Sequence, residues 1–508
     1  MLNIEAVNFH YGETHEQCLH DVSLHVKAGE CVLLCGESGC GKTTVTRLVN
    51  GLIPHFYEGE FSGKVVVSGL DVTKTMPDVL AGTVGSVFQN PRSQFFSLDT
   101  TGEIAFGCEN LGLSPAEIRE RVKKTSAELG IERLLDRDIF ALSGGEKQLI
   151  AIAAAYALSP EVFVFDEPSS NLDWNAVGEL AHLMLRLKQA GRTLIVAEHR
   201  LYWLAGPIDR VVYLRGGRIA GDWQAAAFLA LPERERAELG LRALNPEALR
   251  PSASMVVWEQ APMQEQAPTQ GRTAPNLRVS DLSAWYKRGE PVLRGISFEA
   301  RPGESVAILG GNGAGKTTLA RTLCGLNRKA VGKITLNGSK LSPKARAGPF
   351  YLVMQESGYQ LFTDSVENEL LLSKNRRSRP TSEKVGEILE SLSLTDFRER
   401  HPMSLSGGQR QRTAIGTAMA HEAEVLIFDE PTSGLDYQNM RRVVAVIEQL
   451  RAEGKAVFII THDYELLLAA CTRALVLEDG RLKADFPLTK DSIGRIKEIF
   501  SWTQASSK

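Results

Sequence analysis

Short apolar runs that end at glycine-rich loops, carboxylates or histidines recur along the chain and predict buried strands. CVLLCG and VAILGG each lead into a glycine-rich loop. FVFDEP and LIFDEP close on two acidic residues, and TLIVAEH and AVFIITH close on a histidine. Continuous apolar runs that alternate with helical stretches are typical of an α/β core with a largely parallel sheet. In such a sheet the ligand site is expected at the carboxyl ends of the strands.

The same series of motifs occurs twice. Ser143 and Ser406, in LSGGEKQ and LSGGQRQ, are 263 residues apart, and so are Asp166 and Asp429 in the two DEP motifs. The lysines of the two glycine-rich loops are 274 residues apart, so the first copy is 11 residues longer before its LSGG motif, mainly around HFYEGEFSGKVVV. Constant spacing between several motifs indicates a duplicated domain.

The composition between the copies predicts a linker. The stretch WEQAPMQEQAPTQGRTAP is rich in Ala, Gln, Glu and Pro and lacks sustained periodicity, and some helix is expected in PERERAELGLRAL just before it. IGRIKEIFSW near the end predicts an amphipathic helix that packs on the second domain. We therefore expect a first domain over 1–231, a linker over 232–275, a second domain over 276–485 and a tail over 486–508.

The composition narrows the class of protein. The chain has 508 residues, 43% hydrophobic, with a net charge of −3, which gives no basic field of the kind that nucleic-acid binders show. Its seven cysteines are odd in number and form no CxxC pair, which argues against a disulfide framework and a zinc site. No signal peptide is recognisable, and no apolar run approaches the ~20 residues that span a bilayer. These features favour a cytosolic protein, which could still sit on a membrane through partners.

GESGCGKT at 36–43 and GGNGAGKT at 310–317 fit the spacing of phosphate-binding loops. The glycines let backbone N–H groups wrap closely around phosphates, the lysine reaches the β- and γ-phosphates, and the threonine hydroxyl binds Mg²⁺. Two such loops, each placed after a strand, predict two nucleoside triphosphate sites. The predicted contacts are Gly36, Ser38, Gly39, Gly41, Lys42, Thr43 and Thr44 in the first copy, and Gly310, Asn312, Gly313, Gly315, Lys316, Thr317 and Thr318 in the second.

Carboxylates follow the DEP strands of both copies. Asp166 and Asp429 end those strands, as a water-mediated Mg²⁺ ligand should. Glu167 and Glu430 come next and are placed to polarise an attacking water. The alternative, an acidic helix N-terminus without chemistry, fits poorly with their recurrence at one distance from LSGG.

Three further pairs are weaker signals taken singly. Gln89 and Gln355 are single amides, and His199 and His462 each follow a strand, where a histidine is often structural. Their places in the repeated series favour functional roles. Tyr11 and Tyr286 are candidates for stacking on an adenine ring, with a core aromatic as a serious alternative.

The LSGG motifs open apolar helices. Ser143 and Ser406 are expected to cap those helices, while the glycines that follow, Gly144, Gly145, Gly407 and Gly408, expose N–H groups at a positive helix end. Each copy thus carries a second phosphate-binding device, which invites pairing between copies.

The ordered set of phosphate loop, Gln, LSGGQ-type signature, DEP, (N/G)LD and His resembles the ATP-binding cassette (ABC) ATPases in both halves. The resemblance implies ATP and Mg²⁺ as cofactors, an antiparallel β subdomain and a helical subdomain beside each core, and head-to-tail pairing of the two cassettes. Glu would be the base, His would contact the γ-phosphate, and Gln would sense Mg²⁺ and link to a membrane partner. The first site would combine Lys42, Thr43, Gln89, Asp166, Glu167 and His199 with Ser406, Gly407 and Gly408, and the second would combine Lys316, Thr317, Gln355, Asp429, Glu430 and His462 with Ser143, Gly144 and Gly145.

The copies differ at Glu146 against Gln409 and at Asn171 against Gly434. Neither difference removes a catalytic group, so both sites are expected to hydrolyse ATP. Whether they do so at equal rates stays open.

FQNPRSQFFSLDTTGEIAFGCENLGLS and MQESGYQLFTDSVENELLLS resemble the ATPases of energy-coupling factor importers, which take up vitamins and metal ions. The resemblance implies a shared transmembrane coupling subunit and a small substrate-binding membrane subunit as partners, with residues 92–111 and 358–372 facing the cytoplasmic side of the cell membrane. The alternatives are sugar importers, cobalt or nickel importers, and soluble tandem cassettes that act on ribosomes or DNA. Sugar-importer ATPases typically carry a degenerate second loop, whereas GGNGAGKT is intact. The sequence does not name the substrate.

Overall fold

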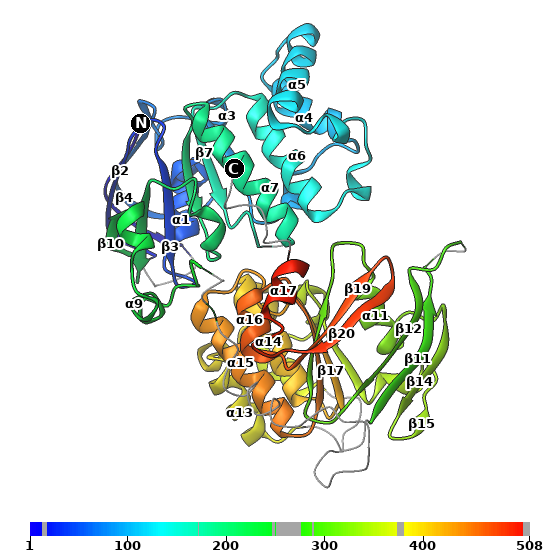
Figure 1. The fold of residues 1–508 in the computed structure, drawn as a ribbon. Helices are drawn as coiled ribbons and strands as arrows, with labels where there is room; N and C mark the ends of the chain where they lie inside the picture. Colours follow the sequence, from blue (N-terminus) through cyan, green and yellow to red (C-terminus); the bar gives the residue numbers. More distant parts are fainter. Residues whose placement is uncertain are drawn as a thin grey trace. The chain divides into compact units, whose positions relative to one another are not determined.

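The computed structural model describes residues 1–12, 18–170, 172–245, 249, 276–286, 289–372 and 380–500. The chain divides into two compact units, Met1–Asn245 and Pro246–Lys508. Within the described residues, each unit contains one mostly parallel sheet and one antiparallel sheet (Figure 1). This arrangement confirms the predicted α/β fold of two cassettes.

The parallel sheet of the first unit is built from the apolar runs that the sequence pattern singled out. Its strand order is β10-β9-β3-β8-β7-β6. Only the pairing of β10 with β9 is antiparallel, and β10 lies at the edge of the sheet. Every residue of β3 and β8 is buried, as expected for strands covered on both faces. The strands are β3 (Cys31–Gly36), β6 (Val84–Val87), β7 (Val162–Asp166), β8 (Thr193–Ala197), β9 (Arg210–Arg215) and β10 (Arg218–Gln224).

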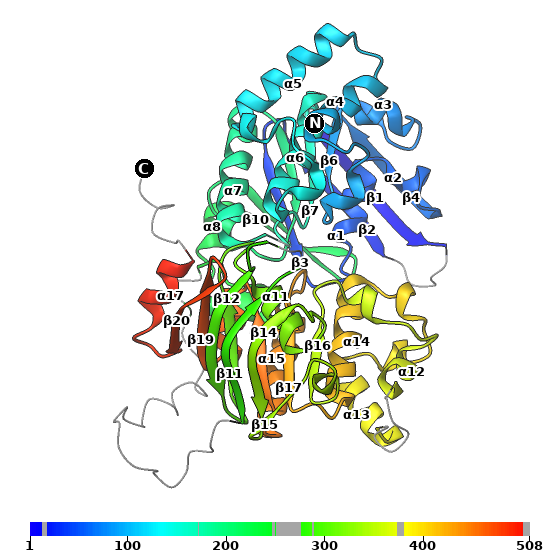
Figure 2. The same cartoon turned by 90° about the vertical axis from the view of Figure 1, so that its right-hand side faces the viewer.

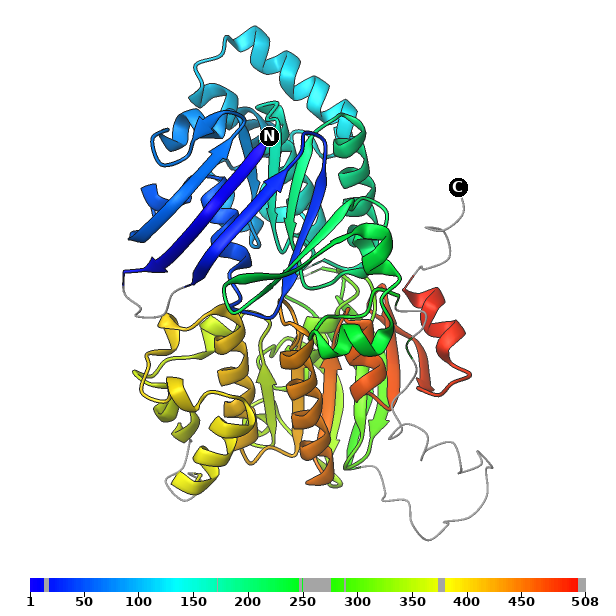
Figure 3. The ribbon, with the colours of Figure 1, turned by 90° about the vertical axis from the view of Figure 1, so that its left-hand side faces the viewer.

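The antiparallel sheet of the first unit covers one side of this core. Its order is β2-β1-β4-β5, with β1 (Leu2–Tyr11), β2 (Leu19–Val26), β4 (Gly59–Val67) and β5 (Leu70–Asp71). Buried and exposed residues alternate along β2, because one face packs inward and the other meets water. The buried face shares an apolar cluster with β3 and with α1 (Lys42–Val49). Figure 3 shows these long blue strands side by side.

The helices of the first unit gather mainly on the other side. In Figure 1, α4, α5 and α6 lie opposite the antiparallel sheet, and they form the expected helical subdomain. Ser114 caps α5 with a complete capping box, in which Glu117 returns the hydrogen bond. The helices are α2 (Leu52–His55), α3 (Pro77–Ala81), α4 (Thr100–Asn110), α5 (Pro115–Leu129), α6 (Gly144–Ala157), α7 (Trp174–Gln189), α8 (Ala225–Leu229) and α9 (Glu233–Glu238).

The second unit repeats this plan (Figure 2). The parallel sheet runs β16-β17-β18-β13-β19-β20 and the antiparallel sheet runs β12-β11-β14-β15. The strands are β11 (Leu277–Ala284), β12 (Leu293–Ala300), β13 (Ser305–Leu309), β14 (Ala330–Leu336), β15 (Ser339–Lys340), β16 (Phe350–Val353), β17 (Val425–Asp429), β18 (Ala456–Ile460), β19 (Arg473–Glu478) and β20 (Arg481–Pro487). The helices are α11 (Lys316–Leu323), α12 (Val366–Leu371), α13 (Ser382–Ser391), α14 (Gly407–Ala420), α15 (Tyr437–Ala452), α16 (Tyr464–Ala470) and α17 (Ile493–Ile499).

The segments assigned to the linker and the tail are partly described. Residues 232–245 include α9, and Leu241 and Leu244 are buried in the same apolar cluster as β9. Most of the predicted linker, 246–248 and 250–275, lies outside the described residues. In the tail, α17 buries Ile496, and the ring of Phe500 meets that of Tyr464 edge-on at 5.7 Å. The amphipathic pattern thus forms the expected helix. Among the residues that the structure describes, none belongs to a helix long and apolar enough to cross a membrane.

Candidate active sites

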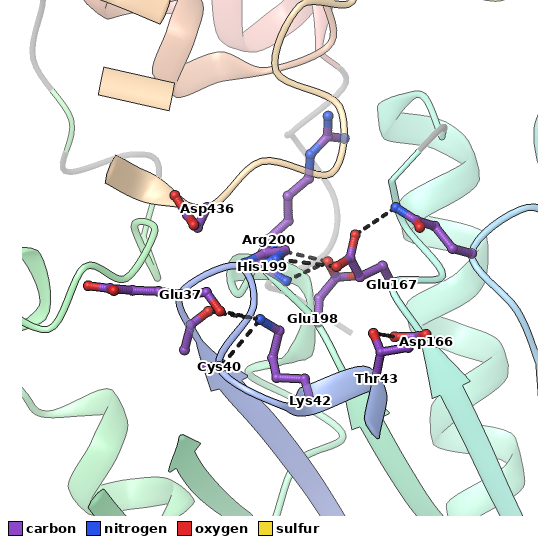
Figure 4. Close-up of polar contacts among 12 residues, drawn as sticks. Glu37, Cys40, Lys42, Thr43, Asp166, Glu167, Glu198, His199, Arg200 and Asp436 are labelled. Atoms are coloured by element: carbon purple, nitrogen blue, oxygen red, sulfur yellow. Dashed lines mark hydrogen bonds and ion pairs between the residues drawn. The ribbon is translucent and has the colours of Figure 1, made fainter. Parts of the chain in front are cut away.

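Each phosphate-binding loop closes around its own lysine. Lys42 begins α1 directly after the loop, and its Nζ donates to the carbonyl oxygens of Gly36 at 3.0 Å and Glu37 at 2.9 Å (Figure 4). In the second unit, Lys316 Nζ donates in the same way to Gly310 at 2.7 Å and Gly311 at 3.0 Å. Both lysines are buried, and each ammonium is held by two backbone carbonyl groups of its own loop. This is the geometry in which a lysine meets a phosphate.

Glycine is required at two points of the loop. Gly36 has φ of 142°, and a Cβ there would lie 2.2 Å from the carbonyl oxygen of Leu214. Gly41 has φ of 104°, and a Cβ there would meet the side chain of Leu19 at 2.6 Å. A side chain at either position would therefore displace the strand neighbours and open the loop.

Hydroxyl and carboxylate meet where the resemblance places Mg²⁺. Thr43 Oγ1 donates to Asp166 Oδ1 at 3.1 Å, and Thr317 Oγ1 donates to Asp429 Oδ2 at 3.0 Å. Burial, with the neighbouring charge of Glu167, raises the pKa of Asp166 to about 7, and burial also raises the pKa of Asp429. A buried carboxylate beside a hydroxyl offers the hard oxygen ligands that Mg²⁺ prefers, and a cation there would favour the charged form. The residues present therefore fit a Mg²⁺ ion, which when bound would neutralise phosphate charge.

Three predicted residues of the first unit come together after three different strands. Glu167 follows β7 and accepts from Gln89 Nε2 at 2.8 Å, and Gln89 follows β6. The other carboxylate oxygen of Glu167 lies 3.2 Å from His199 Nε2, which follows β8. Neighbouring parallel strands end at the same sheet edge, which is why residues far apart in sequence converge here. Figure 4 shows His199 turned toward Glu167.

The second unit brings its glutamate and histidine together less closely. His462 Nε2 lies 3.7 Å from Glu430 Oε1, and the backbone N–H of His462 donates to Glu430 Oε2 at 3.3 Å. Gln355 follows β16 as Gln89 follows β6. The two units thus share their residues but differ in how the histidine meets the carboxylate.

A buried glutamate beside His199 was missed from the sequence. Glu198 is 1% exposed and accepts hydrogen bonds from Ser169 and from the backbone of His199. In the sequence, Glu198 is visible only as an acidic residue that follows an apolar strand. The second copy has Thr461 at the equivalent position. An unmatched residue carries no weight in a comparison of repeats, so the pattern passed over it.

The LSGG motifs start their helices as expected. Ser143 caps α6 and Ser406 caps α14, and both motifs form complete capping boxes. The third helical residue closes the box in each unit, Glu146 in the first and Gln409 in the second. The difference between these two residues therefore leaves the local geometry unchanged. A Cβ at Gly145 would lie 2.6 Å from the Cβ of Ala176, so α6 approaches α7 closely. Gly144, Gly407 and Gly408 lie in the first turns.

The other difference between the copies can be followed only in the second. Gly434 has φ of 68°, whereas Asn171 lies outside the described residues.

The aromatic candidates have different surroundings. Tyr11 ends β1, and its hydroxyl accepts from Arg47 Nη1 at 2.9 Å. Arg47 in turn stacks over the ring of Tyr57, 4.0 Å from its centroid, and Tyr57 meets Tyr11 edge-on. Tyr286 follows β11 and is 45% exposed. Adenine stacking stays a prediction for both tyrosines.

The chain is similar to known proteins over most of its own length and most of theirs. The profile of a family described as "ABC transporter" matches residues 19–170 and 293–433. A putative ABC transporter ATP-binding protein of Treponema denticola is 45% identical over 483 residues, which cover 95% of this chain and 96% of that protein. A putative HMP/thiamine import ATP-binding protein of Bacillus subtilis is 34% identical over 501 residues, which cover 96% of this chain and 91% of that one.

Solved structures agree on the fold. A model of ribosome-bound archaeal Pelota and ABCE1 matches with a TM-score of 0.65 and 24% identity, covering 97% of this chain and 80% of that one. At this identity the likeness carries the fold of two cassettes alone.

Proposed function

Because the chain belongs to the ABC transporter family of ATP-binding proteins, we propose that it is the energy-coupling subunit of an importer of the energy-coupling factor type. As a member of this family it binds ATP and is an ATPase. Hydrolysis drives uptake of a vitamin or a metal ion through two kinds of separate membrane protein, a transmembrane coupling subunit and a small substrate-binding subunit. The chain then works at the cytoplasmic face of the cell membrane.

In this proposal each ATP lies between the phosphate loop of one cassette and the LSGG motif of the other. Lys42 holds the β- and γ-phosphates, and Thr43 and Asp166 hold Mg²⁺. Glu167 takes a proton from the attacking water, and His199 contacts the γ-phosphate. The corresponding residues of the second copy form the second site. Closure on ATP and reopening after hydrolysis move the membrane subunits.

An exposed apolar patch beside the predicted glutamine carries the importer proposal. In the first unit we define it by Phe96, Leu98 and Phe140, which are 73%, 75% and 75% exposed. The two loops of the patch adjoin, because a backbone amide next to Phe140 donates to the carbonyl of Leu98 at 3.0 Å. Phe362 and Met403 stand at equivalent places in the second unit and are 76% and 56% exposed. Large apolar side chains gathered in this way mark interaction sites.

Hydrogen bonds connect the loop that carries the patch to the strand that leads to Gln89. Gln94, in the loop between Gln89 and Phe96, accepts from the backbone of Phe88 at 3.0 Å and donates to the carbonyl of Ser86 at 2.9 Å. These bonds fasten the loop to the end of β6. A partner bound at Phe96 would thereby be coupled to Gln89, which hydrogen-bonds Glu167.

The choice of cargo rests on the relatives. The name of the Bacillus subtilis relative, HMP/thiamine import, favours a vitamin-like cargo over a metal ion. The likeness to an archaeal ABCE1 gives no support for ribosomal action, since it carries the fold alone. No feature of the described residues favours a sugar importer.

The test is to isolate the chain from detergent-solubilised membranes and identify what comes with it. We expect a transmembrane subunit and a small, very hydrophobic subunit. Phe96→Asp and Phe362→Asp should reduce recovery of the membrane subunits, because each removes roughly 1.5–3 kcal/mol of apolar burial, or about a tenfold to hundredfold loss in affinity. ATP binding should stay as in the parent.

Met76→Asp is the matched control, since Met76 is 62% exposed in the first unit and lies outside the patch. An equal loss of partners in the control would contradict the patch as the docking site. Recovery of ribosomes or DNA without any membrane protein would refute the importer itself.

A further inference from the structure

Glu198 joins the two loops that carry the predicted catalytic residues of the first unit. Its Oε2 accepts from Ser169 Oγ at 2.7 Å and from the Ser169 backbone at 3.2 Å. Its Oε1 accepts from the backbone N–H groups of His199 at 2.7 Å and Arg200 at 3.1 Å. Ser169 lies two residues after Glu167. One carboxylate thus fixes the loop of the glutamate to the loop of the histidine.

A buried carboxylate of this kind is costly unless donors surround it. Burial raises the pKa of Glu198, and the nearby charge of Glu167 raises it further, against the hydrogen bonds that lower it. Four donors in three residues offset that cost. The arrangement therefore specifies the geometry of the two loops closely rather than adding stability.

The second unit places its carboxylate on the other side of the histidine. Asp463 accepts from Thr432 Oγ1 at 2.7 Å, and Thr432 stands where Ser169 stands in the first copy. The other oxygen of Asp463 caps α16, accepting from the backbone of Glu465 and Leu466. The loops are again joined, but this carboxylate binds the helix instead of the histidine backbone.

The consequence lies in what the catalytic glutamate contacts. In the second unit, the backbone N–H of His462 donates to Glu430, and the imidazole Nε2 is 3.7 Å away, beyond hydrogen-bond range. In the first unit, Glu198 takes that backbone N–H, and the imidazole Nε2 of His199 lies 3.2 Å from Glu167.

The geometry points to Glu198 as a positioning residue of the first ATP site, which occupies the backbone of His199 so that its imidazole meets Glu167. This inference rests on the proposed roles of Glu167 and His199. Thr461 stands at the position of Glu198 in the second copy, so the effect of Glu198 should be confined to one of the two sites.

The test is single-turnover hydrolysis of ATP by the whole chain in its membrane complex, with protein in excess over labelled ATP. Glu198→Gln keeps the shape but sets an amide N–H₂ group against existing donors. The fraction of the bound ATP that occupies the first site should then be hydrolysed about tenfold to a hundredfold more slowly, since a misplacement of about 1 Å has costs of this size. The amount of MgATP bound should stay close to that of the parent, although the melting temperature should fall, because the new amide faces buried donors.

A second variant guards against misfolding. Ser169→Ala keeps the carboxylate and removes one of its donors, so hydrolysis should slow in the same direction by a smaller factor. Ser126→Ala is the matched control, because Ser126 is a buried serine whose hydroxyl donates to a carbonyl within α5. This control should hydrolyse ATP like the parent.

Several outcomes would overturn the inference. Hydrolysis of all bound ATP at the parent rate in Glu198→Gln would remove any positioning role. Loss of ATP binding in step with melting temperature would show a merely structural role. In a chain that already carries Glu167→Gln, adding Glu198→Gln should not slow ATP hydrolysis further. Additional slowing would show that Glu198 does not act through Glu167. The proposed function fails separately, if membrane subunits do not accompany the chain or if Glu167→Gln together with Glu430→Gln leaves hydrolysis intact.

Discussion

One buried carboxylate holds the loop that carries the apolar patch, and its removal should release that loop. Glu103, on α4, is 3% exposed, and its Oε2 accepts from the backbone N–H groups of Phe96 at 2.9 Å and Ser97 at 2.8 Å. Glu369 does the same for Phe362 and Thr363 in the second unit. We predict that Glu103→Ala opens the first loop while leaving the nucleotide site in place.

The magnitude follows from the two lost hydrogen bonds. A hydrogen bond to a charged group contributes about 1.5–3 kcal/mol net, so removing both costs about 3–6 kcal/mol of local stability. Water can reach the exposed loop and solvate the freed N–H groups, which favours the lower end. A loss of about 3 kcal/mol corresponds to opening of the loop roughly 150 times more often.

Amide hydrogen exchange measures this opening directly. Exchange at Phe96 and Ser97 should accelerate by about two orders of magnitude, while amides in α6 keep their protection. Recovery of the membrane subunits should fall, because an ordered patch is part of their docking site. Glu109→Ala is the control, since Glu109 is an exposed glutamate on the same helix. Unchanged exchange at the loop would refute the reasoning, and so would equal acceleration throughout α4 and α6.

Three further outcomes test individual residues. Lys42→Ala should weaken ATP binding at the first site about 10- to 100-fold, because it removes a charge-assisted phosphate contact, and calorimetry that still finds two equal sites would contradict this. Burial raises the pKa of Asp166 to about 7, so the folded chain keeps a proton that the unfolded chain releases above about pH 4, and its stability without Mg²⁺ falls as pH rises from about 4 to about 7. Asp166→Asn should therefore gain up to about 4 kcal/mol relative to the parent across that range, measured by thermal unfolding at several pH values without nucleotide. Glu146→Gln should keep ATP hydrolysis within about twofold of the parent, because Gln409 closes the same capping box. The partly exposed ion pairs with Arg137 and Arg133 that it removes contribute only about 0–1 kcal/mol each. A large loss of activity would show a role beyond the cap.

The strands, loops and helix starts could be predicted because each depends on short-range pattern. The apolar run before Gly36 became β3, and Ser143 became a helix cap, since burial and capping act on neighbours in sequence. The order of strands in the sheet was not predictable, because β3 pairs with β8 and β9, which lie far along the chain. The patterns give no means of choosing among such distant partners.

The same limit explains which site residues escaped notice. Gln89, Glu167 and His199 were found through their recurrence in both copies, and the structure brings them together. Glu198 contacts Ser169 across 29 residues and has no counterpart in the second copy, so neither local pattern nor repetition marks it. Arg47 and its stacking on Tyr57 were missed for the same reason, since Tyr57 lies in the longer segment of the first copy.

Any inequality between the two ATP sites should arise at the histidine rather than at the differences that the motifs display. Glu146 and Gln409 fulfil one local role, because each closes a capping box with the same hydrogen bonds. The backbone N–H of the histidine donates to Glu198 in the first unit and to Glu430 in the second. The imidazole Nε2 lies 3.2 Å from the catalytic glutamate in the first unit and 3.7 Å in the second. A separation of 3.7 Å is too long for a hydrogen bond, so the imidazole is within hydrogen-bond range of the glutamate in the first unit, whereas in the second unit the histidine reaches its glutamate through the backbone N–H. A site with its catalytic groups already in contact needs less rearrangement on the way to the transition state. The first site should therefore hydrolyse its ATP faster than the second.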